Sequence, residues 1–354
     1  MSSAYIKPGE SVAPTPLLAS DPGLDNQSTM SQHSDDEQDV DEQWMLGFAE
    51  PADAHDLLRH RFRSKVGGRP AWLNPEQLPS SALLRCSVSG QPLHFLLQVY
   101  APIDDAPPSA FHRFIFVFIS AAGNKLSQPG AVKAFRCQLP RHNPFYSSDP
   151  DPAELPKQVQ QPPKSDPWNV AEAEAALREG QSPPGLQGMH LYPEYELVVE
   201  PEEASLDDLG AAMQHHSVGN GDEGEALDDV SASVMDSVEA QATPAQQQYA
   251  RFAAKIASAP EQVIRYRFAR EVKPLCPGTT SPPGPGAIPA CPHCHSARQF
   301  EFQVMPQMIH YLGVDADAAT SPDWGTIAVY SCPRSCATSE AYTEEHVWVQ
   351  PPDS

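Results

Sequence analysis

The pattern of apolar and polar positions predicts short strands in two groups, one in each half of the chain. The first group mixes alternation with apolar runs, as in an antiparallel meander, and covers Leu93 to Tyr100, Phe114 to Ile119 and Lys133 to Leu139. The second group is rich in β-branched and aromatic residues and covers Gln299 to Val304, Gly325 to Tyr330 and His346 to Gln350.

Other segments predict a further strand, an edge strand and a turn. The run Leu191 to Glu200 alternates glutamate with apolar residues, which predicts a strand with an acidic face formed by Glu194, Glu196 and Glu200. Upstream, a basic alternating cluster favours an edge strand over a localisation signal; it consists of Arg59, Arg61, Arg63 and Lys65. Gly67 and Gly68 predict a turn before the aromatic anchor Trp72.

Helical spacing precedes the second strand group. Apolar residues recur at helical intervals at Tyr249, Phe252 and Ile256. Pro260 then favours a second helical turn, whose apolar face continues through Val263, Ile264 and Phe268. We therefore expect a pair of core-packing helices before the second strand group.

Composition divides the chain into folded and unfolded segments. The 39 prolines and the long polar and acidic tracts cannot bury enough apolar surface to offset the entropy of ordering them. The expected fold is α+β and mostly β, with two related small antiparallel lobes. The expected segments are a disordered tail at 1–41, an N-terminal β lobe at 42–146, a Pro-rich linker at 147–190 with one candidate helix from Trp168 to Arg178, an acidic strand at 191–200, an acidic disordered linker at 201–243 and a C-terminal zinc-ribbon-like domain at 244–354.

Two close cysteine pairs in the C-terminal segment form a metal-site pattern. Cys291 and Cys294 make a Cys-x-x-Cys pair, and Cys332 and Cys336 make a Cys-x-x-x-Cys pair, each next to a predicted strand. Four thiolates on two tight turns bind Zn²⁺ tetrahedrally in zinc ribbons and leave no open position for water. The sequence therefore predicts one structural zinc ion. The alternatives are unliganded buried thiols, or a redox dithiol at the first pair, although a redox motif expects a βαβ context.

The two strand groups are similar to each other. Placing Cys86 on Cys291 aligns the first strands without a gap, with Phe95 on Phe300 and Gln98 on Gln303. The alignment continues in the later strands, with 116–118 on 328–330 and 135–138 on 347–350. We infer that the chain contains two versions of one small β module.

In the first module three of the four ligand positions are not cysteine. Cys86 is retained, but Ser89, Ser120 and Asn124 take the other positions. Hydroxyl and amide oxygens are poor ligands for zinc, so the first lobe is expected to be metal-free. The alternative is a site completed by a nearby side chain, for which the candidates are Cys137, His94 and His112.

The charge balance limits the choice of partners. A net charge of −23 opposes a surface for naked nucleic acid, which needs basic patches, and suits a basic protein partner. The alternative is that the acidity only maintains solubility. The start of the sequence has no signal-like segment and no apolar run is long enough for a membrane span, so we expect a soluble intracellular protein.

Several dense motifs in matching order resemble the programmed cell death protein 2 family. In the C-terminal half they are Pro260 to Tyr266, both cysteine pairs, Phe300 to Gln307, Asp323 to Ile327 and Tyr342 to Glu345. In the N-terminal half they are Val66 to Leu73, Gln98 to Pro102 and Phe135 to Arg141. The resemblance covers both predicted lobes and omits the tail and the linkers.

The resemblance implies a cytoplasmic factor that shuttles to the nucleus and acts as a chaperone in ribosome biogenesis. Such a factor binds a newly made small-subunit ribosomal protein, called S two in eukaryotes and S five in bacteria, and supports its delivery into the small ribosomal subunit. Acidic segments would screen the basic client, and edge-strand addition between the lobes could hold it. A monomer without direct nucleic-acid or membrane contact is expected.

The chain departs from the family pattern in several places. It lacks the MYND-type zinc finger that animal members carry between the lobes, which removes support for functions of that finger such as contacts to transcriptional corepressors. His295 replaces the glycine that follows the second cysteine, at a position that often needs a left-handed backbone, and Cys276 replaces a tryptophan.

The sequence bears on two other classes of function. A zinc-ribbon protein-interaction or transcription-related factor remains the alternative, although the sequence lacks the basic stripe that nucleic-acid binding requires. An enzyme is not expected, because no nucleophile has a matched base, no glycine-rich phosphate loop precedes a helix, and a four-cysteine zinc site is closed.

Overall fold

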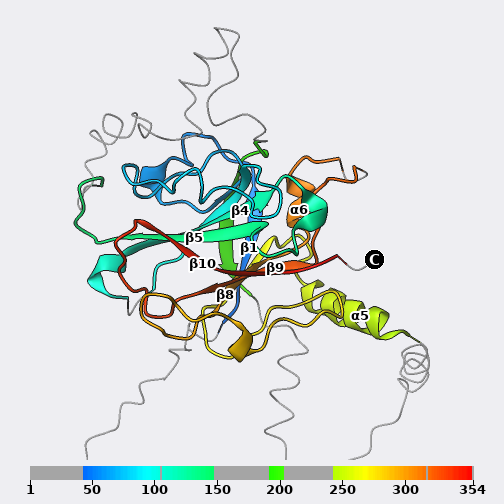
Figure 1. Ribbon diagram of the computed structural model, residues 1–354. Coiled ribbons are helices and arrows are strands. Elements are labelled where there is room, and N and C mark those ends of the chain that lie inside the picture. Colours follow the sequence, from blue (N-terminus) through cyan, green and yellow to red (C-terminus); the bar gives the residue numbers. More distant parts are fainter. Residues whose placement is uncertain (1–42, 104–105, 147–190, 203–241, 316–317, 353–354) are drawn as a thin grey trace, which may run out of the picture. The chain divides into compact units, whose positions relative to one another are not determined.

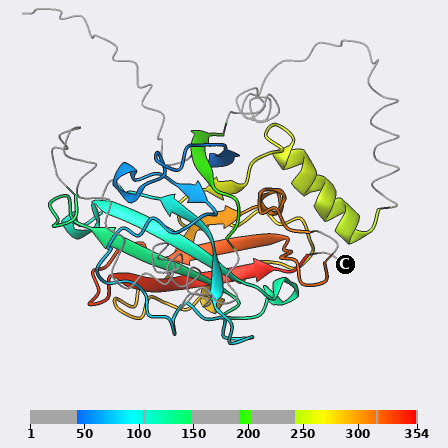
Figure 2. The ribbon, with the colours of Figure 1, turned by 90° about the horizontal axis from the view of Figure 1, so that it is seen from above.

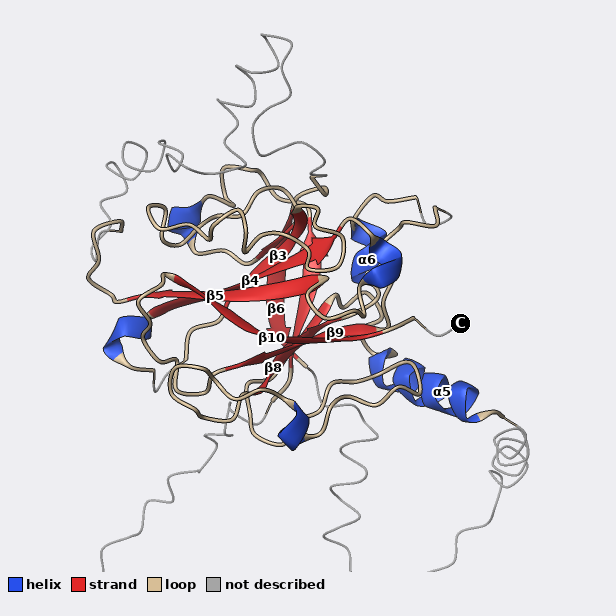
Figure 3. Ribbon diagram, viewed as in Figure 1, coloured by secondary structure: helices blue, strands red, loops and turns tan. Residues whose placement is uncertain are grey.

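The computed structural model describes residues 43–103, 106–146, 191–202, 242–315 and 318–352. The predicted disordered tail, the Pro-rich linker with its candidate helix, and most of the acidic linker lie outside the described residues. Within the described residues the protein is mostly β, and Figure 3 shows the strands in the centre with loops and short helices around them.

Ten strands of the described residues close into one antiparallel barrel, in the order β1-β6-β2-β3-β4-β5-β10-β9-β8-β7 (Figure 1). Their bounds are β1 Met45–Glu50, β2 Lys65–Val66, β3 Leu93–Tyr100, β4 His112–Ser120, β5 Val132–Leu139, β6 Tyr195–Pro201, β7 Ile264–Tyr266, β8 Gln299–Val304, β9 Thr326–Ser331 and β10 Tyr342–Gln350. The strands of both predicted lobes thus share one barrel, and the expectation of two separate lobes is corrected.

The sequence located most of these strands. All six strands of the two predicted groups are present, and β3 and β8 have the predicted bounds. The acidic run became β6, but the basic cluster is mainly a short 3-10 helix, η2 Arg59–Arg61, followed by the two residues of β2. The edge-strand interpretation was wrong, because β2 lies between β6 and β3 inside the closed barrel. Strand β1 was not predicted.

Only one helix of the predicted pair is present. Helix α5, Pro244–Ile256, begins with Thr243 and Gln246 in a capping box and lies beside the barrel in both views (Figure 1, Figure 2). The prediction of the second helix was wrong, because Ile264 belongs to β7, which pairs with β1 and β8. The apolar residues of this segment fit both the helical period and the strand period, and pairing with neighbouring strands makes the segment a strand. The remaining helices are α6 Met308–Tyr311, η3 Pro108–Ala110, η4 Gly123–Lys125 and η5 Pro285–Ala287.

The barrel consists of two halves of five strands in the same chain order, β1 to β5 and β6 to β10. The first strands are exchanged between the halves, because β1 pairs with β7 and β6 pairs with β2. Strands β1 and β6 also pair with each other, and β5 pairs with β10. The halves are therefore interlocked along two seams.

Strand registers confirm the internal repeat in the first two strands. Leu97 lies opposite Val117, and Phe302 lies opposite Val329, as the sequence alignment requires. The register shifts between Phe95 and Leu97 in one half, and at the equivalent place in the other half, between residues 300 and 302. The repeat therefore extends to an irregularity of the backbone.

The alignment of the third strands was wrong by one residue. Phe135 lies opposite Phe116, and Trp348 lies opposite Ala328. Since Phe116 and Ala328 are equivalent, Phe135 corresponds to Trp348 rather than to Val347. The match of Gln138 with Gln350 had suggested the other register, but a one-residue slip exchanges the inner and outer faces of a strand.

Equivalent glutamines hold the segment that precedes each meander. The backbone N–H of Ala71 donates to Gln98 Oε1 at 2.8 Å, and that of Leu275 donates to Gln303 Oε1 at 2.6 Å. Ala71 and Leu275 are therefore equivalent, and so are the residues that follow them, Trp72 and Cys276. Cys276 is the position at which this chain departs from the family's tryptophan. Both glutamines are buried, so the contacts satisfy polar groups inside the fold.

The barrel interior is one apolar cluster to which all ten strands contribute. Its members include Ala49, Val66, Leu97, Ile115, Ala134, Leu197, Ile264, Phe302, Ile327 and Val349. The outer face of the first half packs Phe116, Phe118 and Phe135 against Trp72. The outer face of the second half packs a smaller cluster around Phe300 and Tyr330. Burial on both faces explains the continuous apolar runs of β3 and β4.

Candidate metal centre

The two cysteine pairs meet at one end of the second half. Cys291 and Cys294 precede β8, and Cys332 and Cys336 lie between β9 and β10. The thiol sulfur atoms of all four lie within 4.8 Å of one another. The distance between the Sγ atoms of Cys294 and Cys332 is 3.4 Å, that between Cys291 and Cys336 is 3.6 Å, and that between Cys332 and Cys336 is 3.8 Å.

These distances fit a tetrahedral site. A disulfide would place two sulfur atoms about 2.05 Å apart, and all four cysteines are free. A tetrahedron with metal–sulfur bonds of about 2.3 Å has sulfur atoms about 3.8 Å apart along its edges. The four predicted residues can therefore hold one metal ion.

The backbone of each cysteine turn is bent by one left-handed residue. His295 has φ +57° and Ser335 has φ +40°. The N–H of His295 donates to the carbonyl of Cys291, and the N–H of Ser335 donates to that of Cys332. The left-handed conformation expected where histidine replaces the family glycine is thus present, and histidine tolerates it better than most residues.

The thiols share negative charge. Burial opposes ionisation of Cys294, but hydrogen bonds from Ser296 and from the neighbouring thiols outweigh it and lower the pKa of Cys294 to about 6. Burial raises the pKa of Cys332, and burial together with the neighbouring thiols raises that of Cys336. One thiolate therefore disfavours the next, and a bound cation would relieve this repulsion.

Side chains from the first half hold the second cysteine turn, which sequence reasoning missed. Gln138 on β5 donates to the carbonyl of Ser335 at 2.9 Å, and both Nη atoms of Arg136 lie 3.4 Å from the carbonyl of Cys336. Both side chains lie in a motif that carried the family resemblance, but nothing in the sequence indicated their target. The metal centre is therefore built from both halves.

A buried glutamate connects the two cysteine turns. Glu345 on β10 accepts from Arg136 Nε at 2.8 Å and from Arg298 Nε at 2.7 Å, and its side chain is fully buried. Arg298 also donates to the carbonyls of Pro289 and Ala290, just before Cys291. One carboxylate thus orients the arginines that hold both turns, as outer-shell groups do at metal sites.

The first half keeps the shape of a cysteine turn around Cys86. Its N–H donates to Gln91 and its carbonyl accepts from Gly90, as Cys291 does with Ser296 and His295. Burial opposes ionisation of Cys86, but hydrogen bonds from Ser120 and Ser89 outweigh it and lower its pKa. Three of the four equivalent positions therefore still converge, although only one of them offers a thiol.

The proposed rescue ligands do not join this cluster. In the described ranges, the four-cysteine cluster is the one group of three or more His, Cys, Asp or Glu side chains close enough to hold a metal. Cys137 is buried among aromatic residues, and burial raises its pKa to about 12. Cys276 is also buried, and burial raises its pKa to about 12. The metal-free state of the first half stays a prediction.

The predicted acidic face of β6 is largely neutralised within the fold. Glu194 forms an ion pair with Lys65, and Glu196 forms one with Arg63 at 3.1 Å. Glu200 is exposed. The acidic run was therefore predicted correctly as a strand, but two of its three glutamates form ion pairs with basic residues of the first half.

These features define a class of protein: an internally repeated β-barrel with a four-cysteine cluster in one half that could hold a metal ion. Two family models match the chain, "Programmed cell death protein 2, N-terminal domain" at residues 43–153 and "Programmed cell death protein 2, C-terminal putative domain" at residues 246–351. The chain belongs to the programmed cell death protein 2 family.

Curated relatives extend the match over most of the chain. Programmed cell death protein 2 of Mus musculus is 35% identical over 341 residues, which cover 86% of this chain and 95% of the relative. The protein of that name from Bos taurus is 32% identical, with the same coverage. Programmed cell death protein 2-like of Homo sapiens is 26% identical and covers 77% of this chain and 85% of the relative. No solved structure matches.

Proposed function

We propose that this protein is a dedicated chaperone of a newly synthesised, basic small-subunit ribosomal protein and supports its delivery into the assembling small subunit. The client would be the protein called S two in eukaryotes and S five in bacteria, as the family resemblance implies. The chaperone would act in the cytoplasm and shuttle to the nucleus. The described part of the chain contains no helix long and apolar enough to cross a bilayer.

The observation that carries this proposal is the distribution of charge. The chain has a net charge of −23, although the described residues contain 19 Lys and Arg against 16 Asp and Glu, so the negative excess belongs to the segments outside them. The basic residues in ion pairs with glutamates of the described region are Arg63, Lys65, Arg113, Arg136, Lys255, Arg265 and Arg298. The acidic segments predicted from the sequence, rather than the barrel, thus carry the negative charge that would attract and screen a basic client.

The barrel changes the proposed mode of binding. Each described strand has a neighbour on both sides, because the order of strands is closed. Addition of a client strand to a sheet edge, expected from the sequence, therefore loses its support. We propose instead that the client contacts the outer surface of the barrel.

We further propose that the metal is one structural Zn²⁺ held by Cys291, Cys294, Cys332 and Cys336. Four thiolates suit zinc, fill its tetrahedral coordination and leave no position for a reacting water. The ion would fix the two cysteine turns against Arg136 and Arg298. Catalysis is not part of the proposal.

The proposed function is tested by purifying this protein together with the client while ribosomes are still translating the client. A tagged full-length chain would be purified from lysed cells with ribosome-bound nascent chains, and the associated messages would be sequenced. Enrichment of the message for the small-subunit protein is expected. Absence of enrichment for any small-subunit ribosomal protein, with the chaperone folded and metal-loaded, would contradict the proposal.

A further inference from the structure

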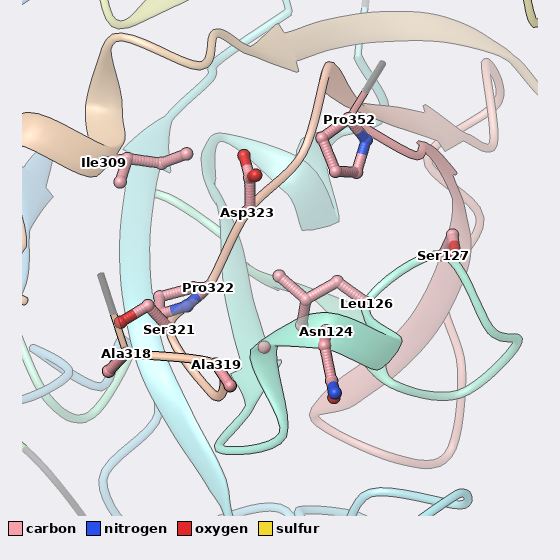
Figure 4. A pocket seen from close by; sticks show the side chains of 11 residues that line it. Asn124, Leu126, Ser127, Ile309, Ala318, Ala319, Ser321, Pro322, Asp323 and Pro352 are labelled. Carbon is pink, nitrogen blue, oxygen red and sulfur yellow. The ribbon is translucent and has the colours of Figure 1, made fainter. Parts of the chain in front are cut away.

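A cavity of about 390 Å³ lies where the first half meets the loop before β9 (Figure 4). The first half contributes the η4 turn with Asn124 and Leu126, and the second half contributes Ile309 of α6, Asp323 and Pro352. Its volume is in the range of sites for small groups. The η4 turn contains the position that corresponds to the fourth cysteine of the metal site.

One carboxylate stands in this cavity. Asp323 is exposed, and it forms no ion pair with any residue of the described ranges. Figure 4 shows its carboxylate between Ile309 and Pro352. Its neighbours Pro322 and Trp324 are both buried, so the backbone that carries Asp323 is anchored on both sides.

The loop that carries Asp323 is also fixed to the first half. The N–H of Gly123 donates to the carbonyl of Thr320 at 3.1 Å. A Cβ atom at Gly123 would lie 2.2 Å from the carbonyl oxygen of Ser321, so this close approach requires glycine. The position of the carboxylate is thus set by contact between the two halves.

The other walls of the cavity are partly apolar. Leu126 belongs to the interior cluster of the barrel, and Ile309 packs against that cluster. Figure 4 shows Leu126, Ile309 and the ring of Pro352 around the space next to Asp323, whereas the side chain of Asn124 points away from it. A ligand that fills the cavity therefore meets aliphatic surface and one negative charge.

We propose that this cavity binds the side chain of an arginine or lysine of a basic polypeptide. The aliphatic stem of such a side chain would pack on Leu126, Ile309 and Pro352, and its cationic head would pair with Asp323. A phosphate-bearing ligand is disfavoured, because Asp323 repels it. The inference rests on the proposed function and gives the basic client one defined contact.

A titration of the full-length, metal-loaded protein with the blocked tripeptide Gly-Arg-Gly tests the site. Nuclear magnetic resonance would follow the methyl groups of Ile309 and Leu126 and the backbone N–H groups of Ser127 and Asp323, all of which belong to residues that line the cavity. We expect saturable shifts at these groups, and no such shifts with the citrulline tripeptide, which has the same shape without the charge. Asp323→Asn should weaken binding about fivefold, the upper range for an exposed ion pair.

Glu340→Gln is the matched control, because it removes one negative charge from another exposed acidic residue of the same half. It should leave the dissociation constant unchanged. Absence of shifts at the cavity, or equal weakening by both variants, would overturn the inference even if a ribosomal protein message co-purifies. Conversely, specific arginine binding without enrichment of such a message would retain the cavity site and reject the proposed function.

Discussion

Arg113 on β4 and Glu301 on β8 form a bidentate ion pair in which neither side chain is exposed. Burial disfavours the charged guanidinium, but Glu301 outweighs this effect and raises the pKa of Arg113. Glu301 lies at the register shift of β8, and Ser331 adds a further hydrogen bond to its carboxylate. The pair joins the first half to the second inside the protein.

Glu301→Gln should strongly destabilise the protein. The change leaves the charge of Arg113 buried without its counter-charge, which costs about 3–5 kcal/mol of unfolding free energy. Urea unfolding followed by circular dichroism would measure the loss. Glu344→Gln is the control, because Glu344 is an exposed glutamate on β10 and its replacement should change stability by less than about 0.5 kcal/mol. Equal stabilities of the two variants would contradict the role of the pair.

Arg136→Lys should weaken metal binding while the barrel stays folded. Lysine keeps the charge but cannot contact Glu345 and the carbonyl of Cys336 together, so the second cysteine turn loses a support. Loss of such outer-shell contacts reduces metal affinity about 10- to 100-fold. Competition with a chromogenic zinc chelator would measure it. Arg334→Lys, at an exposed arginine of the same turn, should leave the affinity unchanged.

Cys294→Ser should destabilise both halves together. The halves share strand pairs along two seams, so loss of the metal cannot unfold one half alone. Fluorescence of two single-tryptophan proteins, retaining either Trp72 or Trp348, would report each half during thermal unfolding. The two transitions should coincide and move to lower temperature together. Separate transitions, with Trp72 unaffected by the variant, would show independent lobes.

Stability should decrease as the pH falls below about 6.5, with a contribution from His112. Burial lowers the pKa of His112 in the folded state, so the unfolded chain binds the proton more readily. The contribution is fully present above the unfolded pKa and is lost as the pH falls through the lower folded pKa. His112→Phe keeps a ring to stack on Phe62, whose centroid is 4.2 Å away, and should reduce the slope. An unchanged slope in denaturant unfolding between pH 6.5 and 5 would exclude this contribution.

The sequence was sufficient for the six strands of the two predicted groups and for the four clustered cysteines, because both depend on local patterns. Apolar runs located β3 and β8, and the spacing of the cysteines identified the four thiols that meet in space. Periodicity alone could not separate helix from strand at Ile264, where pairing with β1 and β8 decides. Long-range partners were the missing information.

Closure of the barrel could not be predicted for the same reason. The contacts of Arg113 with Glu301 and of Arg136 with Cys336 span 188 and 200 residues along the chain. Both arginines lie in strands of the first half, where their sequence context shows only a basic residue among apolar neighbours. The alignment of the repeats showed that the halves are similar, but similarity does not reveal that their first strands are exchanged.

The exchange of β1 and β6 makes this chain suited to fragment complementation. A fragment with residues 43–146 contains β1 but lacks β6, the neighbour of β2, and a fragment with residues 191–352 contains β6 but lacks β1, the neighbour of β7. Each fragment therefore carries a strand that the other needs. Two separately produced pieces should assemble into one barrel, and their association would serve as a direct reporter of whether the fold has closed.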